Sequence, residues 1–242
     1  MRYLILSDIH EDFQAFNAVL ERVSPLGWDK MYFLGDVVGH RPATSRKEEV
    51  LKCIDLLRQH DAQCILGNWE GWLLGEVGMR EQTNYQQTSA TYREYRQDFD
   101  ELIALLQNTD ILGWMSTWAE TIALDEPTVS IEFWHGSPIP EGDFKTWETY
   151  LKFDNLRLRD LIFNQYVNAE PAKKLILNGH THQAGYFKLA NRNRRAFTDN
   201  LAVNPNSIDL RYVFAINPGC ILEQGGYALL LETEPTLQFR FL

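Results

Sequence analysis

The chain begins with the stretch Arg2-Tyr3-Leu4-Ile5-Leu6-Ser7, which leads directly into Asp8-Ile9-His10. A short apolar run that stops at polar side chains predicts a buried strand, which we place at Arg2–Ser7. In open α/β sheets, ligands bind just beyond the carboxyl ends of the strands. The opening residues therefore predict an α/β fold with functional side chains directly after its first strand.

The same pattern repeats further along the chain. Apolar residues at helical spacing predict a helix at Phe13–Val23, which Asp12 could cap, and a second over roughly Arg46–Gln59. Short apolar runs predict strands at Lys30–Leu34 and Ala62–Leu66. Alternation of strands and helices indicates a parallel sheet with right-handed crossovers.

The second half of the chain is predicted to be rich in strands in an antiparallel or mixed arrangement. Helix is expected over most of Trp69–Asp110, where residues 70–120 form a possible cap insertion, and again over Leu151–Asn168. The polar stretch Gln82–Arg96 is either a cap beside the site or, as we favour, a solvated surface helix. Strands are expected at Thr121–Leu124, Val129–Trp134, Leu175–Leu177, Ala184–Leu189, Arg195–Val203, Tyr212–Ile216, Tyr227–Glu232 and Leu237–Leu242. Since no linker or repeat is evident, we expect one domain, residues 1–242.

The composition excludes several classes of protein. The formal net charge is −10, which disfavours a nucleic-acid-coating protein because such proteins need a basic surface, so no DNA partner is expected. The three cysteines, at positions 53, 64 and 220, are scattered and predict neither a disulfide framework nor a thiolate metal site. The first apolar run is too short for a signal peptide or a membrane span. We therefore expect a cytoplasmic protein with no membrane partner, and its oligomeric state is open.

Seven polar side chains follow predicted strands and form the candidate site. Carboxylate, amide and imidazole ligands without thiolate suit Mn, Fe, Co, Ni or Zn. Seven ligands exceed the needs of one tetrahedral ion, whereas two ions that share a carboxylate would use them all. The predicted ligands are Asp8, His10, Asp36, Asn68, His135, His180 and His182.

The motifs that contain these residues resemble those of the calcineurin-like metallophosphoesterases. The resemblance runs from residue 7 to residue 182 and comprises Ser7-Asp8-Ile9-His10, Gly35-Asp36-Val37-Val38-Gly39, Gly67-Asn68-Trp69-Glu70, His135-Gly136 and Gly179-His180-Thr181-His182. Asn217-Pro218-Gly219 is similar to a further signature of the small bacterial and archaeal phosphodiesterase branch. The resemblance implies a four-layer α/β/β/α sandwich with a mainly helical insertion after the third strand.

The resemblance also implies a division of the ligands between two divalent ions, for which Mn is our first choice ahead of Fe, Zn or Ni. Asp8, His10, Asp36 and His182 would hold one ion, and Asp36, Asn68, His135 and His180 the other. A hydroxide between the ions would attack phosphorus in line, so Asp36 and Asn68 are also counted as catalytic residues. The expected substrate is a phosphodiester or phosphoanhydride of a small molecule or nucleotide.

One departure from the family pattern affects the predicted chemistry. Many members have a histidine after the third-motif asparagine, where it is thought to assist the leaving group, and this chain has Trp69. The small phosphodiesterase branch often lacks this histidine too. His40 is a candidate replacement, while Arg41 and Trp69 are candidate substrate contacts. The alternative for His40 and Arg41 is a role as solvated loop residues, and we favour that alternative.

Glu70 and four tryptophans are expected to have supporting or structural roles. Glu70 is expected to orient a ligand or a backbone amide rather than bind metal. Four tryptophans could stack on a base near the site, but core or cap packing explains them more economically: Trp72, Trp114, Trp118 and Trp147.

The fold family also includes an interaction scaffold of the retromer, so a catalytically weak scaffold is the alternative function. A DNA nuclease is disfavoured by the acidic charge and by Trp69.

Overall fold

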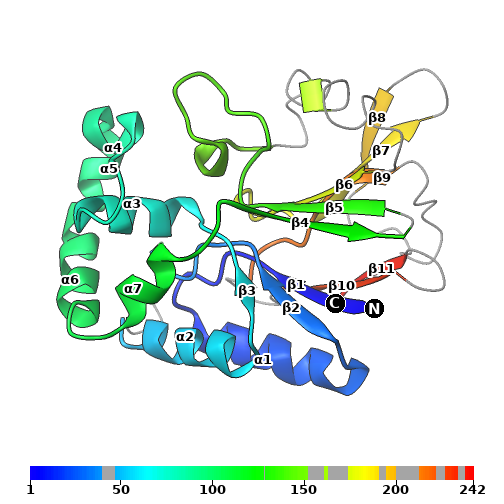
Figure 1. Ribbon diagram of the computed structural model, residues 1–242, viewed down its shortest axis with the longest axis horizontal. Helices are drawn as coiled ribbons and strands as arrows, with labels where there is room; N and C mark the ends of the chain where they lie inside the picture. The colour runs from blue at the N-terminus through cyan, green and yellow to red at the C-terminus, as the bar shows by residue number, and fades with distance from the viewer. Residues whose placement is uncertain are drawn as a thin grey trace.

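A computed structural model describes residues 1–39, 47–127, 129–151, 161–162, 174–190, 195–199, 213–221, 227–233 and 238–242. His40 and Arg41 lie outside these residues, as does nearly all of the expected helix Leu151–Asn168. The described residues form two sheets, one above the other, with helices beneath and to one side (Figure 1).

The first sheet has the order β11-β10-β1-β2-β3. Its parallel part consists of β1 (Arg2–Leu6), β2 (Lys30–Phe33) and β3 (Gln63–Cys64). Two strands from the end of the chain extend it in antiparallel fashion, β10 (Leu229–Glu232) and β11 (Gln238–Phe241). The third strand is shorter than the predicted Ala62–Leu66, because Ile65 continues it only as an isolated bridge to Ala119.

The second sheet has the order β4-β5-β6-β9-β7-β8. Parallel pairing joins β5 (Val129–Trp134) to β6 (Lys174–Asn178), and β6 to β9 (Val213–Asn217). The remaining pairs are antiparallel and involve β4 (Thr121–Glu126), β7 (Gly185–Ala190) and β8 (Arg195–Asp199). The predicted mixed, strand-rich second half is therefore confirmed.

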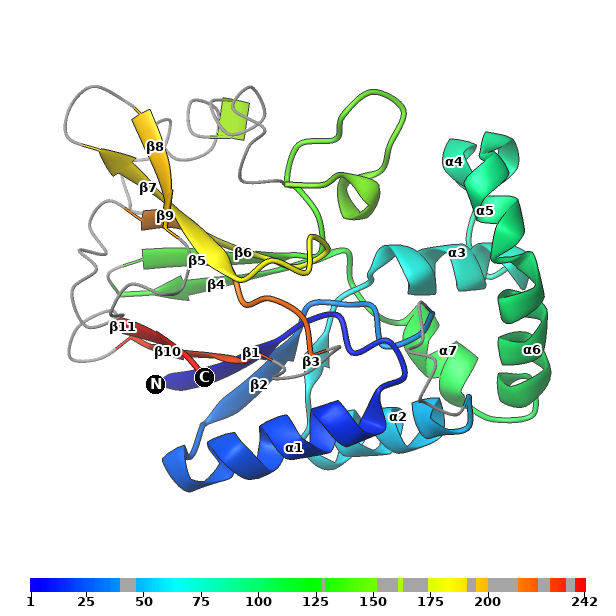
Figure 2. The same ribbon diagram turned by 180° about the vertical axis from the view of Figure 1, so that it is seen from behind.

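The helices α1 (Phe13–Val23) and α2 (Glu49–Gln59) cover the outer face of the first sheet (Figure 2). Asp12 Oδ1 accepts a hydrogen bond from the backbone N–H of Ala15 at 2.9 Å, which confirms the predicted cap. A 3₁₀ turn, η1 (Ser24–Leu26), ends this helical stretch. The second helix starts later than the predicted Arg46, which itself lies outside the described residues.

Two hydrophobic cores follow from the alternation of side chains along β1. Leu4 and Leu6 pack toward the helices, whereas Tyr3 and Ile5 pack toward the second sheet. Between the sheets, the Tyr32 ring stacks on Phe133 with ring centroids 4.3 Å apart. The predicted sandwich of two sheets is confirmed, with one covering helix layer among the described residues. The second helix layer of the predicted four-layer arrangement stays a prediction.

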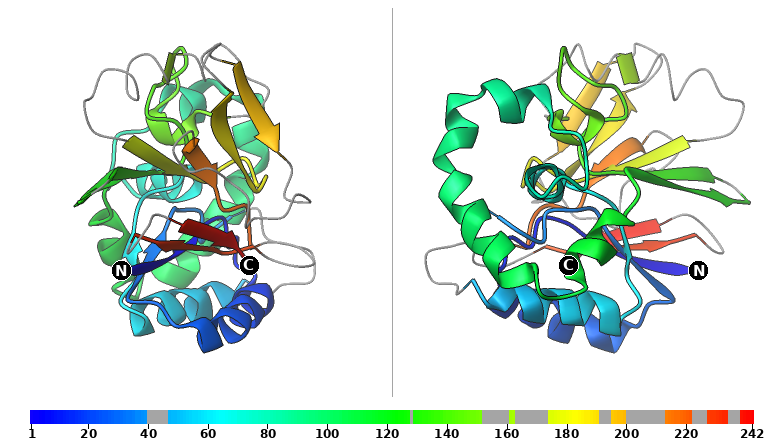
Figure 3. Two further views of the ribbon diagram at one scale, coloured as in Figure 1. Left: turned by 90° about the vertical axis from the view of Figure 1, so that its right-hand side faces the viewer. Right: turned by 60° about the vertical axis from the view of Figure 1, so that its left-hand side comes forward.

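A helical segment follows the third strand, as predicted. It consists of α3 (Asn68–Glu76), α4 (Asn84–Thr88), α5 (Ala90–Glu94), α6 (Arg96–Leu106) and α7 (Ile111–Ser116), which form an arc beside the sheets (Figure 3). The stretch Gln82–Arg96 is divided between short helices, because Ser89 ends α4 and caps α5 through the backbone N–H of Tyr92. Among the described residues, none of the helices is long and apolar enough to cross a membrane.

Candidate metal centre

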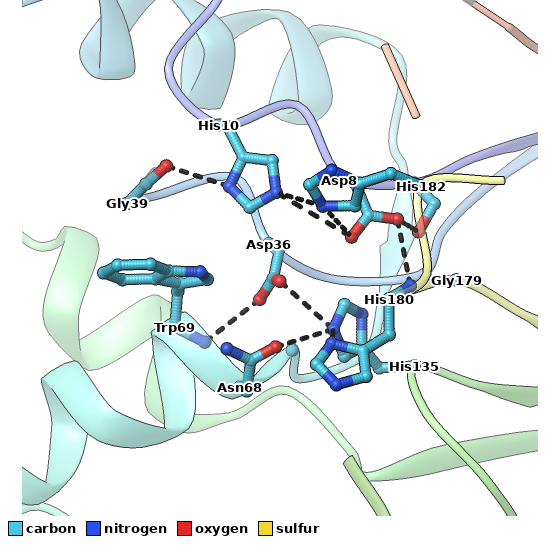
Figure 4. Close-up of polar contacts among 12 residues, drawn as sticks. Asp8, His10, Asp36, Gly39, Asn68, Trp69, His135, Gly179, His180 and His182 are labelled. Carbon is cyan, nitrogen blue, oxygen red and sulfur yellow. Dashed lines mark hydrogen bonds and ion pairs between the residues drawn. The ribbon is translucent and has the colours of Figure 1, made fainter. Parts of the chain in front are cut away.

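The seven predicted ligands lie in the segments that directly follow the carboxyl ends of five strands, and these ends face the helical arc (Figures 1 and 4). Asp8 and His10 follow β1, Asp36 follows β2, and Asn68 begins α3 after β3. His135 follows β5, while His180 and His182 follow β6. These side chains therefore meet beyond the carboxyl ends of the strands, where ligands bind in open α/β sheets.

The backbone at these positions has an unusual conformation. Among the described residues, seven that are not glycine have positive φ, and five of them are predicted ligands: Asp8, His10, Asp36, His180 and His182. A residue other than glycine with positive φ carries a backbone strain on the order of 1–3 kcal/mol, which persists where the surrounding structure imposes it. Strain of this kind is concentrated here in the turns that bring the polar side chains together.

The first group of ligand atoms comes from Asp8, His10 and His182, which lie within 4.8 Å of one another. The His10 and His182 Nε2 atoms are 2.9 Å apart, and Asp8 Oδ1 lies 3.4 Å from His182 Nε2 and 3.8 Å from His10 Nε2. His10 Nδ1 is 2.8 Å from the Gly39 carbonyl oxygen. A carbonyl only accepts, so Nδ1 donates and Nε2 directs its lone pair toward the group.

The second group is formed by Asp36, His135 and His180, whose ligand atoms also lie within 4.8 Å of one another. His135 Nε2 lies 3.1 Å from Asp36 Oδ2, 3.1 Å from His180 Nδ1 and 3.0 Å from Asn68 Oδ1 (Figure 4). The other ring nitrogen, Nδ1, donates to the Leu34 carbonyl at 2.6 Å. Asp36 thus lies in the second group, and its predicted role as a bridge to the first remains a prediction.

Electrostatics differ sharply between the two histidines of the second group. Burial lowers the pKa of His135, but the neighbouring Asp36 carboxylate outweighs burial and raises this pKa to about 9. Burial together with His135 lowers the pKa of His180 to about 3. Asp8 and Asp36 are fully buried, yet the surrounding histidines keep the pKa of both carboxyls below the usual range. Without a bound cation, the protein therefore favours a protonated His135 close to the ionised carboxylates of Asp36 and Asp8.

The side chains present suit divalent cations. Imidazole nitrogens face each other at 2.9 and 3.1 Å, where at most one proton could be shared between each pair. Asp8 Oδ1 is buried and accepts no hydrogen bond within the described part of the chain. A cation among these lone pairs would satisfy them together, and the oxygen and nitrogen donor set matches Mn, Fe, Co, Ni or Zn.

Glu70 supports the site from behind. Its Oε2 atom accepts hydrogen bonds from the backbone N–H groups of Asp36 at 2.8 Å and Gly67 at 3.0 Å. Its Oε1 atom accepts from Val37 at 2.8 Å and Val38 at 3.2 Å. These contacts confirm the predicted role of Glu70 in orienting backbone amides.

Trp69 lies buried behind the first group, with 6% of its surface exposed. Its ring packs against Tyr95 and Phe99 with centroids 4.9 and 5.5 Å away, and it meets His10 edge-on at 6.5 Å. Its backbone N–H donates to Asp36 Oδ1 at 3.0 Å. The ring therefore belongs to an aromatic cluster, and its contact with a substrate stays a prediction.

The four tryptophans considered as base-stacking residues pack in the interior or beside other side chains. Trp72, Trp118 and Trp147 are between 3% and 8% exposed. Trp114 is partly buried, with the Arg58 guanidinium 4.6 Å above its ring. Core and cap packing, the interpretation favoured from the sequence, is confirmed.

Two residues near the site were not recognised as participants from the sequence. Tyr150 stacks on His180 with centroids 3.8 Å apart and ring planes 26° apart. Asn217 was noted only as part of a motif, but its Nδ2 donates to the Gly179 carbonyl at 2.8 Å and contacts Thr181 Oγ1 at 2.9 Å. Asn217 thereby holds the turn that carries His180. Tyr150 gave no signal in the sequence, because it lies well along the loop after β5 and not directly after a strand end.

A family model and one relative match this sequence. Residues 1–214 match the family model described as calcineurin-like phosphoesterase, and the chain belongs to that family. A segment of 75 residues is 32% identical to an uncharacterized protein of Methanocaldococcus jannaschii. This segment is 31% of the chain and spans only 28% of the length of that relative.

Solved structures share the fold. A metallophosphoesterase from Sphaerobacter thermophilus aligns over 100% of this chain and 88% of its own, with a TM-score of 0.66 and 21% identity. A hypothetical protein from Pyrococcus horikoshii aligns over 100% and 86%, with a TM-score of 0.60 and 15% identity. A putative diadenosine tetraphosphatase aligns over 100% and 92%, with a TM-score of 0.53 and 16% identity. At these identities, the likeness establishes the metallophosphoesterase-type sandwich alone.

Proposed function

We propose that this protein is a metal-dependent phosphoesterase that hydrolyses a phosphodiester or phosphoanhydride of a small molecule or nucleotide. The observation that supports this most directly is the pair of three-residue ligand groups at the strand ends. Two divalent cations would supply Lewis acidity and an activated water near neutral pH, as in other two-metal phosphoester sites. The chain's own contribution is the placement and orientation of the ligands.

The assignment of ligands follows the two groups. Asp8, His10 and His182 would hold one cation, and Asp36, Asn68, His135 and His180 the other, with Asp36 shared. The Gly39 and Leu34 carbonyls accept hydrogen bonds from Nδ1 of His10 and His135, which leaves Nε2 of each ring available to a cation. This orientation is built by the backbone, so the site is preorganised before any ion binds.

The leaving group is expected to depart without a protein acid at position 69. Trp69 has no proton to release near neutral pH, and general acid catalysis is typically worth roughly 10²–10⁴-fold in rate. Substrates with acidic leaving groups, such as aryl phosphodiesters and nucleotide anhydrides, should therefore outrank alkyl phosphomonoesters. His40 remains a candidate proton donor, and His40→Ala should change the rate and its pH profile if it serves that role.

A metal-content and turnover assay tests the proposal. Purified protein is reconstituted with Mn²⁺, and bound metal and hydrolysis of bis(p-nitrophenyl) phosphate are measured in parallel. We expect two ions per chain and measurable turnover in the parent protein. His180→Ala and His182→Ala should each lose metal and turnover, while His60→Ala, which changes a histidine at the end of α2, should retain both.

The same assay separates an enzyme from a scaffold. Faster turnover of glycerol phosphate than of the aryl diester would contradict the leaving-group argument. Absence of turnover with Mn, Fe, Co, Ni and Zn would contradict the enzymatic proposal as a whole. That last outcome would favour the alternative function, a protein-interaction scaffold with a catalytically weak site.

A further inference from the structure

Exposed and partly exposed aromatic residues lie in the loop that follows His135 and in the facing helix α4. Phe144 and Tyr150 are 44% and 48% exposed, and both belong to the loop that follows His135. Tyr85, in α4 of the helical arc, is partly exposed and lies 6.0 Å from Phe144 between ring centroids. Large apolar surfaces are normally buried, so exposed rings next to a reactive site indicate a binding surface.

Tyr150 connects this surface to the ligand groups. One face of its ring stacks on His180, and the ring is still about half exposed. Partial burial, followed by the nearby Asp36 carboxylate, Tyr85 and Asp8, raises the pKa of Tyr150 to about 12. The stacking contact places Tyr150 directly beside His180 of the second ligand group.

Buried contacts hold Tyr85 in place and join the helical arc to the loop that carries Phe144 and Tyr150. Trp72 stacks on Tyr85 with centroids 5.2 Å apart and planes 17° apart. The Glu148 carboxylate, in the 3₁₀ turn η2 (Thr146–Glu148), accepts hydrogen bonds at 2.7 Å from both Trp72 Nε1 and Thr83 Oγ1. Glu148 is 3% exposed, so this link between the loop and the helical arc is shielded from water. Such a rigid arrangement lowers the entropy cost of binding a flat ligand.

We propose that Tyr150, Phe144 and Tyr85 form a subsite that stacks on the base of a nucleotide whose phosphate lies at the metal centre. The proposal rests on the function inferred above and specifies its substrate class. Every nucleobase has a π-face, and stacking on an aromatic side chain strengthens binding roughly fivefold to a hundredfold. A sugar phosphate or glycerol phosphate has no flat group to occupy these rings.

Direct binding tests the subsite without relying on turnover. Dissociation constants of AMP and ribose 5-phosphate are measured by calorimetry on Mn²⁺-loaded protein, with phosphate release followed in the same samples. The two probes share the ribose and the phosphate and differ only in the base. We expect AMP to bind at least about fivefold more tightly than ribose 5-phosphate.

Three variants and a control assign this preference to residues. Tyr150→Leu should bring the ratio of the two dissociation constants close to one, and Phe144→Leu should reduce it. Tyr150→Phe should preserve the ratio, because it keeps the ring and removes only the hydroxyl. Trp28→Leu is the matched control, since Trp28 is a partly exposed aromatic residue that precedes β2, at the opposite end of that strand from the site.

The outcomes distinguish this inference from the proposed function. Equal binding of the two probes by the parent protein, or an unchanged ratio in a folded Tyr150→Leu variant, would overturn the subsite. Turnover of the aryl diester in the same preparation would then leave the phosphoesterase proposal intact. A strong base preference without turnover for any metal would instead support the subsite and contradict the enzymatic proposal. Thermal unfolding of each variant shows that the fold is retained.

Discussion

Glu70 Oε2 accepts a hydrogen bond from the backbone N–H of Asp36 at 2.8 Å, and the carboxylate as a whole receives four backbone N–H groups. A residue in the first turn of α3 therefore holds the turn that follows β2. Both partners are fully buried, so water cannot replace these hydrogen bonds.

Glu70→Gln is predicted to destabilise the protein by at least about 2 kcal/mol. The substitution sets an amide NH₂ against backbone N–H donors, and each buried donor left without an acceptor costs about 1–3 kcal/mol. Urea unfolding of the metal-free protein measures the loss. Glu21→Gln is the control, because within the described part of the chain Glu21 accepts a single exposed hydrogen bond, from Asn17. A loss at position 70 no larger than that at position 21 would refute the argument.

Gly39→Ala is predicted to be clearly more destabilising than Gly78→Ala. Both glycines have similar positive φ, 73° and 71°, so a conformational strain of about 1–2 kcal/mol is expected at both. A Cβ at position 39 would collide with the Trp69 ring, whereas one at position 78 meets no atom of the described residues within 4 Å. The difference between the two unfolding free energies isolates this collision. Equal losses would show that Trp69 moves aside freely.

Because the Gly39 carbonyl also orients His10, Gly39→Ala should weaken metal binding. Gly78→Ala should leave metal affinity unchanged. A titration of each folded variant with Mn²⁺ distinguishes this effect from general instability.

Metal binding is predicted to release protons near neutral pH. The pKa of His135 in the metal-free protein is about 9, so the ring is cationic below that pH and must lose its proton to bind an ion. Metal affinity should therefore rise as the pH increases toward 9 and level off above it. His180 contributes little, because its pKa of about 3 leaves it neutral already.

Calorimetry in buffers of different ionisation enthalpy measures this release. About one proton or more per chain is expected near neutral pH, falling above pH 9. His135→Ala should remove much of the release. Binding in the parent protein without any proton release would show that His135 is neutral before the ion arrives.

Trp69→His is predicted to change both stability and substrate preference. Loss of the large ring from the cluster with Tyr95 and Phe99 should cost on the order of 2–4 kcal/mol. If the new imidazole assists the leaving group, turnover of glycerol phosphate relative to the aryl diester should rise at least about tenfold. Trp69→Phe is the matched control, because it also reduces the ring but adds no titratable group. An equal substrate ratio in both variants would argue against a proton-transfer role at this position.

Local patterns were enough to predict most strands and to place the seven candidate ligands at strand ends. In β1, the apolar run and the abrupt change to Ser7-Asp8 mark both the strand and its functional end. The helix α1 and its cap were predicted, because periodicity and capping act within one or two turns. The Gln82–Arg96 stretch was less predictable, since Ser89 divides it into two short helices.

The sequence by itself therefore determined the α/β class, the family motifs and the set of polar residues at the strand ends. These depend on interactions between near neighbours in the chain. Only the tertiary structure decided that His10 faces His182, that Trp69 is buried behind His10, and that Tyr150 covers His180. Contacts between residues far apart in sequence depend on how the sheets and the helical arc pack, and no local pattern encodes that packing.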